Sequence, residues 1–177
     1  EMSGLIWAYL GPAPVPLVPR YDLFVWDNVL RDIGVQVLPC NWLQCQENSL
    51  DPIHLEWLHA YQSGYVLERE GVPPERRRPV QRHAKIGFDV FEHGVIKRRT
   101  YRGTKEEGGT TEEDPQWKLG PPIVFPNWLR VGNGFQMRIP MDDTHTWIVY
   151  YTYYAPPEGV RAPKQDSIPI YDVPIFD

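Results

Sequence analysis

The residues best suited to chemistry in this 177-residue chain lie close together, between Asn48 and His59. His54 and His59 are five residues apart, and Asp51 lies three residues before the first of them. Imidazole nitrogens presented from one segment are a common way of holding a catalytic metal ion. An aspartate often accepts a hydrogen bond from the free ring N–H of such a ligand. The segment therefore predicts a metal site with two imidazole ligands.

The spacing of the histidines sets a geometric condition for this site. On a regular α-helix, residues five apart are rotated by about 140°, against about 40° for the four-residue spacing of the zinc protease motif. His54 and His59 can share a metal only if the helix is distorted, and a π-bulge or a kink would bring the rings together. Asp51 and His54, three residues apart, share one face of a helix. Without a distortion, both histidines are ordinary helix residues, and this interpretation stays open on spacing alone.

The overall charge and hydropathy exclude two classes of partner. Eighteen basic and 23 acidic side chains give a formal net charge of −5, which provides no large basic face for nucleic acid. No apolar run approaches the ~20 residues needed to span a bilayer, and the first residues lack the pattern of a signal peptide. We therefore expect a cytoplasmic protein that binds neither nucleic acid nor membrane.

The two cysteines, Cys40 and Cys45, do not indicate a metal cluster. Four residues separate them at the approach to a predicted helix, a geometry that is awkward for a disulfide. An iron–sulfur cluster with four thiolates needs more cysteines than this chain has, and a Rieske cluster needs a Cys-x-His and a Cys-x-x-His pair, neither of which occurs. The chain therefore has no ligands for a [2Fe-2S] cluster of its own.

The elements that position the histidines are predicted to be helical, and helix is expected early in the chain and strand late. Residues 5–10 read as a strand, followed by a proline-rich connector that marks a boundary with an upstream unit. Residues 40–61 read as helical segments. Asp51 and Pro52 interrupt them as the N-cap and first-turn residue of a new helix, which carries both histidines.

The later part of the chain has the pattern of an antiparallel sheet. Turn residues around Gly94 and Gly132 separate strands predicted at 86–91, 95–101, 123–131 and 135–140, and the clearest strand covers 146–154. In this last strand core packing is the default, although Tyr151 or Tyr153 is a candidate for orienting a substrate. We predict an α+β fold, with a curved sheet whose concave face suits an apolar ligand.

A longer pattern around the histidines resembles a known family. The spacing Asn48-x-x-Asp51-x-x-His54-x-x-x-x-His59, with the preceding Cys-Asn-Trp-Leu-Gln of residues 40–44 and with Glu47, resembles the iron-site segment of the Rieske non-haem iron oxygenases. Residues 4–12 are similar to the strand that joins the Rieske domain of these enzymes to the catalytic domain. Residues 138–147 are similar to the sheet of the phthalate dioxygenase-like branch, which includes oxygenases of aryl acids and aryl ethers. The resemblance implies a helix-grip (Bet v 1-like) fold, in which a curved antiparallel sheet packs around a long helix. Residues 1–12 would be the end strand of a missing Rieske domain, and residues 13–177 a catalytic domain truncated at its C-terminus.

The resemblance also implies a role for each residue of the pattern. His54 and His59 would be ligands of a mononuclear Fe(II), and Asp51 would link this iron to the Rieske cluster of a neighbouring subunit. Asn48 would stand near the iron without being a firm ligand. The family pattern gives Glu56 no ligand role, and we expect this residue at a solvent-facing position of the helix. In the family the third ligand is a carboxylate from a later helix. None is assigned here, because the available aspartates lack a helical context: Asp142, Asp143, Asp172 and Asp177.

By resemblance, the complete protein would be the oxygenase component of an enzyme that activates O₂ to hydroxylate or O-demethylate an aromatic substrate. Electrons would come from NAD(P)H through a reductase or ferredoxin and a Rieske [2Fe-2S] cluster that this chain does not bind. The complete protein would be a homotrimer, and this chain alone would be nearly inactive. Two alternatives remain at this point: a helix-grip carrier of an apolar ligand without redox chemistry, and, less favoured by the histidine spacing, a zinc hydrolase.

Overall fold

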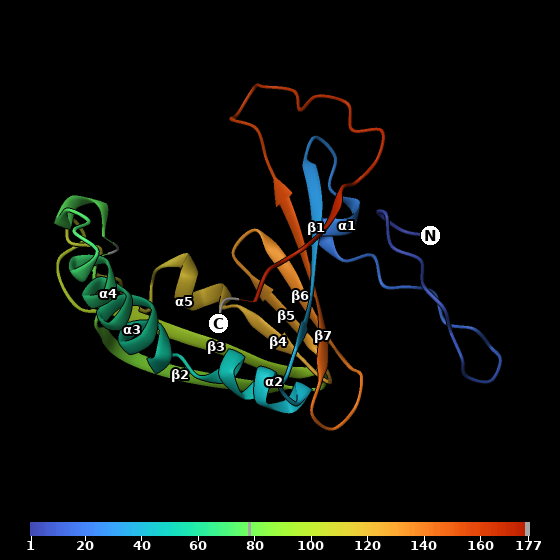
Figure 1. Cartoon of the computed structure of the whole chain (residues 1–177), viewed down its shortest axis with the longest axis horizontal. Coiled ribbons are helices and arrows are strands. Elements are labelled where there is room, and N and C mark those ends of the chain that lie inside the picture. Colours follow the sequence, from blue (N-terminus) through green and yellow to red (C-terminus); the bar gives the residue numbers. More distant parts are fainter. Residues whose placement is uncertain (78, 176–177) are drawn as a thin grey trace.

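A computed structural model describes residues 1–77 and 79–175 of the chain. Within these residues the main element is an eight-stranded sheet in the order β2-β3-β4-β5-β6-β7-β1-β8 (Figure 1). Neighbouring strands are antiparallel, except that β8 pairs with β1 in parallel. The strands are β1 (Leu30–Leu38), β2 (His83–Phe91), β3 (Gly94–Tyr101), β4 (Pro122–Val124), β5 (Trp128–Val131), β6 (Gly134–Pro140), β7 (Thr146–Tyr154) and β8 (Ile170–Asp172). The predicted α+β class with a mostly antiparallel sheet is confirmed.

The helices are short. They are α1 (Asp22–Val25), α2 (Trp42–Leu50), α3 (Ile53–Glu56), the π-helical segment η1 (Trp57–Gln62), α4 (Ser63–Arg69), the 3₁₀ turn η2 (Pro74–Arg76) and α5 (Pro115–Leu119). Figure 1 shows that the sheet is strongly bent and that α3 and α4 lie alongside the β2–β3 hairpin. The single long helix expected for a helix-grip fold is not found as one regular α-helix in the described residues. Helix α2 ends at Leu50, and the run from α3 to α4 contains the π-helical turns of η1.

Two predicted strands need correction, and strand β1 was not predicted. Residues 5–10 form no strand in the structure; only an isolated bridge between Met2 and Leu5 is present there. The predicted strand at 123–131 is two strands, β4 and β5, separated by a turn at residues 125–127. Strand β1 was not predicted, although its apolar residues alternate, because Gly34 and the charged residues near its start mask the pattern. The early part of the chain therefore contains strand as well as helix, while the role of residues 1–12 as part of another domain stays a prediction.

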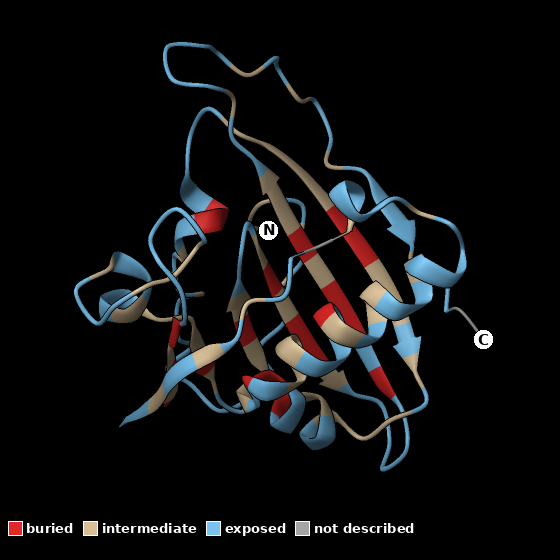
Figure 2. Ribbon diagram, turned by 90° about the vertical axis from the view of Figure 1, so that its left-hand side faces the viewer, coloured by how far each residue is buried: buried red, intermediate tan, exposed pale blue. Residues whose placement is uncertain are grey.

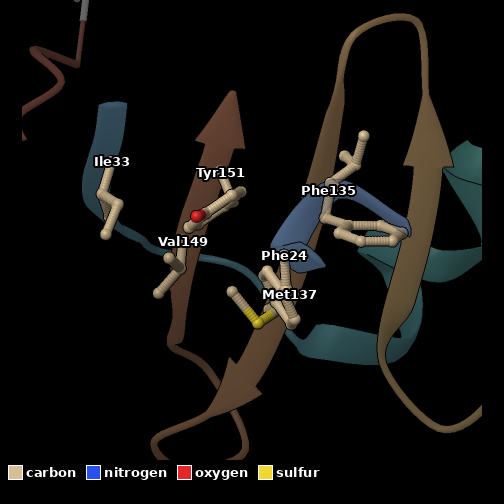
Figure 3. Packing of buried hydrophobic residues seen from close by; sticks show 7 residues of the cluster. Phe24, Ile33, Phe135, Met137, Val149 and Tyr151 are labelled. Atoms are coloured by element: carbon tan, nitrogen blue, oxygen red, sulfur yellow. The ribbon is translucent and has the colours of Figure 1, made fainter. Parts of the chain in front are cut away.

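One face of the sheet carries the main apolar core. Alternate residues of β6 and β7, among them Phe135, Met137, Val149 and Tyr151, pack with Phe24 of α1 (Figure 3). The aromatic rings meet mainly edge to face, as in the contact of Phe24 with Tyr151 at 4.9 Å between centroids. The N-terminal segment closes this face, since Trp7 stacks on Trp128 at 5.9 Å and the Tyr151 hydroxyl donates to the Ser3 carbonyl.

The opposite face is more polar and is covered in part by α2. The intervening residues of β6 and β7 point to this side because successive side chains of a strand alternate. Gln46 and Ser49 of α2 are buried against it, and the Thr146 hydroxyl donates to the Cys40 carbonyl at 2.6 Å. Figure 2 shows buried positions both on the central strands and on the helix that crosses them. This face holds the candidate site.

None of the helices in residues 1–77 and 79–175 combines the length and apolar character that crossing a membrane requires.

Candidate metal centre

The break between α2 and α3 sets the position of the first histidine. Asp51 ends α2, and its carboxylate accepts hydrogen bonds from the backbone N–H groups of Ile53 at 2.9 Å and His54 at 3.0 Å. These bonds satisfy donors at the start of the new helix, as an N-cap does. The predicted interruption at Asp51 and Pro52 is confirmed.

A buried lysine fixes the same break from the sheet side. Lys97 of β3 is 5% exposed, and its Nζ donates to the carbonyl of Ser49 at 2.6 Å and to that of Asp51 at 3.3 Å. It therefore satisfies carbonyls at the end of α2 that have no partner within the helix. Burial, with the charge of Arg99, lowers the pKa of Lys97 to about 8. The sequence analysis did not single out this residue, whose signal is a charge in the middle of an alternating strand.

The π-helical segment η1 resolves the awkward spacing of the histidines. In a π-helix the hydrogen bonds join residues five apart, so these residues lie one turn from each other. The Ser63 N–H donates to the Leu58 carbonyl in this way. The rings of His54 and His59 lie 5.2 Å apart between centroids and are inclined by 70°. The structure thus contains the helix distortion that both rings require in order to bind one metal ion.

Asp51 interacts with the first histidine as well as with the backbone. Its Oδ2 lies 3.3 Å from His54 Nδ1, a separation suited to charge attraction, although that nitrogen is buried without an aligned hydrogen bond. Burial raises the pKa of Asp51, but the hydrogen bonds from Ile53 and His54 and the charge of His54 outweigh it and lower the pKa below its usual value. Asp51 is thus a carboxylate at neutral pH.

No group of three or more His, Cys, Asp or Glu side chains is arranged to hold a metal within residues 1–77 and 79–175. Asp142 is instead a turn residue, since its carboxylate accepts from the N–H groups of Thr144 and His145, and these bonds lower its pKa to about 2. Asp172 lies in the exposed strand β8. Asp177 lies outside the described residues.

Glu56 does not face solvent, contrary to the prediction. Its carboxylate accepts from the backbone N–H of His83 at 2.9 Å and lies 3.0 Å from His83 Nδ1. The side chain of Glu56 is only 12% exposed and that of His83 only 5%. The bond from the His83 backbone, with the His83 ring, lowers the pKa of Glu56. Glu56 therefore joins α3 to β2, and no role as an iron ligand follows.

Asn48 lines a cavity of about 340 Å³ between α2 and the sheet. Arg138 and Gln136 of β6, and Tyr150 of β7, form the sheet side of this cavity. Tyr151 and Tyr153, the tyrosines considered from sequence, belong to the apolar face, so the tyrosine that meets the cavity is their neighbour. The cavity thus shares helix α2 with the segment that leads to the histidines.

Cys40 and Cys45 also line this cavity and are both free thiols. Their sulfur atoms are 4.0 Å apart. Burial, with the neighbouring thiol, raises the pKa of Cys45, so this group is neutral at pH 7.

The chain is similar to oxygenase subunits of enzymes named for aromatic compounds. Over 176 residues it is 38% identical to the 5,5'-dehydrodivanillate O-demethylase oxygenase subunit of a Sphingobium species, an alignment that covers 99% of the chain and 39% of that relative. It is 26% identical over 171 residues to the phthalate 4,5-dioxygenase oxygenase subunit of Pseudomonas putida, covering 88% of the chain and 36% of the relative.

A third relative agrees with the first two. The 3-chlorobenzoate-3,4-dioxygenase oxygenase subunit of Comamonas testosteroni is 25% identical over 176 residues, with 94% of the chain and 37% of the relative covered. No protein-family model matches the chain. The chain spans about two fifths of the length of these relatives. The chain is thus related to part of the oxygenase subunits of aromatic dioxygenases and O-demethylases.

Proposed function

We propose that this chain is the iron-binding part of a Rieske-type oxygenase subunit that hydroxylates or O-demethylates an aromatic substrate. The observation that carries the proposal is η1, which brings the rings of His54 and His59 to 5.2 Å despite their five-residue spacing. Such π-helical turns occur frequently at functional sites. The similarity to oxygenase subunits over nearly the whole chain supports the same conclusion.

The donor set fits one metal ion in part. His54 and His59 would hold Fe(II) with two imidazole nitrogens, and the third ligand would come from residues not identified here. When bound, Fe(II) supplies open coordination positions for O₂ and substrate. Asp51, which is charged at neutral pH, lies 3.3 Å from the ring of His54 and would help to orient it. Lys97 and the Asp51 cap fix the helix break on which this orientation depends.

The remaining parts of the enzyme are also proposals. Asp51 would connect the iron site to a Rieske [2Fe-2S] cluster on a neighbouring subunit of a homotrimer, with electrons from NAD(P)H through a reductase or ferredoxin. The bent sheet, together with the run from α3 to α4, would be the core of a helix-grip domain. Without the cluster, this chain alone would show no NADH-driven turnover.

Iron retention tests the proposal directly. The chain is loaded with Fe(II) under anaerobic conditions, desalted, and assayed for iron per chain. We expect His54→Ala and His59→Ala each to lower iron retention by at least tenfold, because each substitution removes one of the two proposed imidazole ligands. His93→Ala is the matched control, since this histidine is 68% exposed in the β2–β3 turn. Equal iron retention in all four proteins would refute the proposal.

A carrier of an apolar ligand is the alternative from another class. It predicts ligand binding that is indifferent to both histidine substitutions. The cavity against α2 speaks against it, because a buried arginine and two polar side chains line its sheet side.

A further inference from the structure

We propose that the cavity between α2 and the sheet binds the carboxylate group of an aromatic acid, and that Arg138 is the residue that recognises it. This inference rests on the proposed function in one respect, since it takes the ligand to be the substrate of the same site. The carboxylate binding itself follows from the charges that line the helix-facing side of the sheet.

Arg138 is a buried cation without a counter-ion in the described part of the chain. Its side chain is 4% exposed. Its Nη1 donates to Gln46 Oε1 and its Nη2 to Gln136 Oε1, both at 2.7 Å, and both acceptors are neutral amides. Its Nε is buried without a hydrogen-bond partner. Only two of the five N–H donors of the guanidinium are thus assigned, in a group that stays charged in proteins.

Two further cations reinforce the positive potential on this side. Lys97 and Arg99 of β3 point to the same face. Burial lowers the pKa of Lys97, and the charges of Arg99 and Arg138 lower it further, against the opposite effect of the Asp51 charge. Arg99 also has two buried nitrogens without partners, Nε and Nη1. The carboxylates near these cations are few: Asp51 caps α3, and Glu56 is held by His83. Cys45 adds no counter-charge because burial raises the pKa of its thiol.

An unpaired buried charge is expensive, so the arrangement is expected to be completed by an anion. The planar fork of an arginine matches the two oxygens of a carboxylate. The volume of about 340 Å³ suits a ligand with one aromatic ring. Ile148 gives the cavity an apolar side. Burial raises the pKa of Tyr150, whose hydroxyl stays protonated and donates to Gln36 Oε1 at 3.1 Å.

The position of the cavity explains why such a contact would matter. Asn48 lines it and lies three residues before Asp51 and six before His54. A ligand bound by Arg138 at the sheet therefore lies against α2, the helix that precedes the segment with His54 and His59. Arg138 would determine specificity by orienting the substrate and would not take part in the chemistry.

Binding of a charged and a neutral ligand of the same shape tests the inference. The full chain is titrated calorimetrically with 3-methoxybenzoate and with 3-methoxybenzamide. We expect at least tenfold tighter binding of the carboxylate by the wild type and a loss of this preference in Arg138→Gln. Arg138→Lys should recover part of it, because it restores the charge without the fork. Arg130→Gln is the matched control, since Arg130 packs on Phe135 on the apolar face.

Three readouts keep the outcomes apart. Circular dichroism shows whether Arg138→Gln is folded. If it is not, we compare the rise in melting temperature that 3-methoxybenzoate causes in Arg138→Lys with the rise in the wild type. A smaller rise in Arg138→Lys supports the inference, and an equal rise overturns it. Equal binding of both ligands by the wild type, or a preference that survives in Arg138→Gln, would overturn the inference. Iron retention is measured in parallel: carboxylate preference without iron refutes the proposed function alone, and iron without carboxylate preference refutes this inference alone.

Discussion

The two faces of the central sheet are built from the same strands but bury opposite kinds of side chain. On β6 and β7, Phe135 and Tyr151 point into the apolar cluster (Figure 3), whereas Arg138 and Tyr150 line the cavity against α2. The first face is stabilised mainly by burial and ring packing. The second contains buried cations whose partners are neutral. One face therefore stabilises the fold, whereas the buried cations of the other face lower its stability and form a site.

The sharpest test of this difference is a truncation on the apolar face. Phe24→Ala removes a ring that is 4% exposed and contacts five other aromatic rings in the core. We expect a loss of about 3–5 kcal/mol in the free energy of unfolding, measured by urea denaturation. Iron retention of the folded fraction should not change. Phe88→Ala, at a half-exposed position of β2, is the control and should cost much less.

On the polar face, a truncation should act through an unsatisfied charge. Gln46 is fully buried and accepts from Arg138, so Gln46→Ala removes an acceptor from a charged group. We expect a loss of about 1–3 kcal/mol in urea denaturation. The exposed Gln44, two residues earlier on α2, provides the control substitution Gln44→Ala. A loss as large as that of Phe24→Ala would mean that both faces contribute equally to stability.

The smallest expected effect is a pH dependence from Lys97. Its pKa is about 8 in the folded chain against the usual 10.5, so the charged form is disfavoured by folding. Below pH 8 both states bind the proton, and this group contributes no pH dependence. Between about 8 and 10.5 only the unfolded chain keeps it, so stability should rise with pH. Urea denaturation at pH 7.5 and 9.5 should show this rise in the wild type and in Lys85→Met, whose lysine is exposed, but not in Lys97→Met. The same rise in Lys97→Met would assign it to another group.

Local features of the fold were predictable from the sequence. The boundaries of β7 and the helix break at Asp51 follow from alternation and capping, and the spacing of the histidines required a distortion that η1 provides. Contacts between distant segments were not predictable. Glu56 meets His83 across 27 residues and Gln46 meets Arg138 across 92, and nothing local in the sequence fixes these pairings. Strand β1 was missed because its identity depends on pairing with β7, more than a hundred residues later.

The π-helical segment has a consequence for how the site tolerates insertions and deletions. A π turn contains an extra residue compared with an α turn, so the five-residue spacing and η1 depend on each other. Deleting the half-exposed Leu58 would leave the histidines four apart, a spacing that a regular helix already places on one face. Inserting one residue there would place them six apart, a spacing that the present π turn does not accommodate. The length of this segment is therefore constrained in one direction more than in the other.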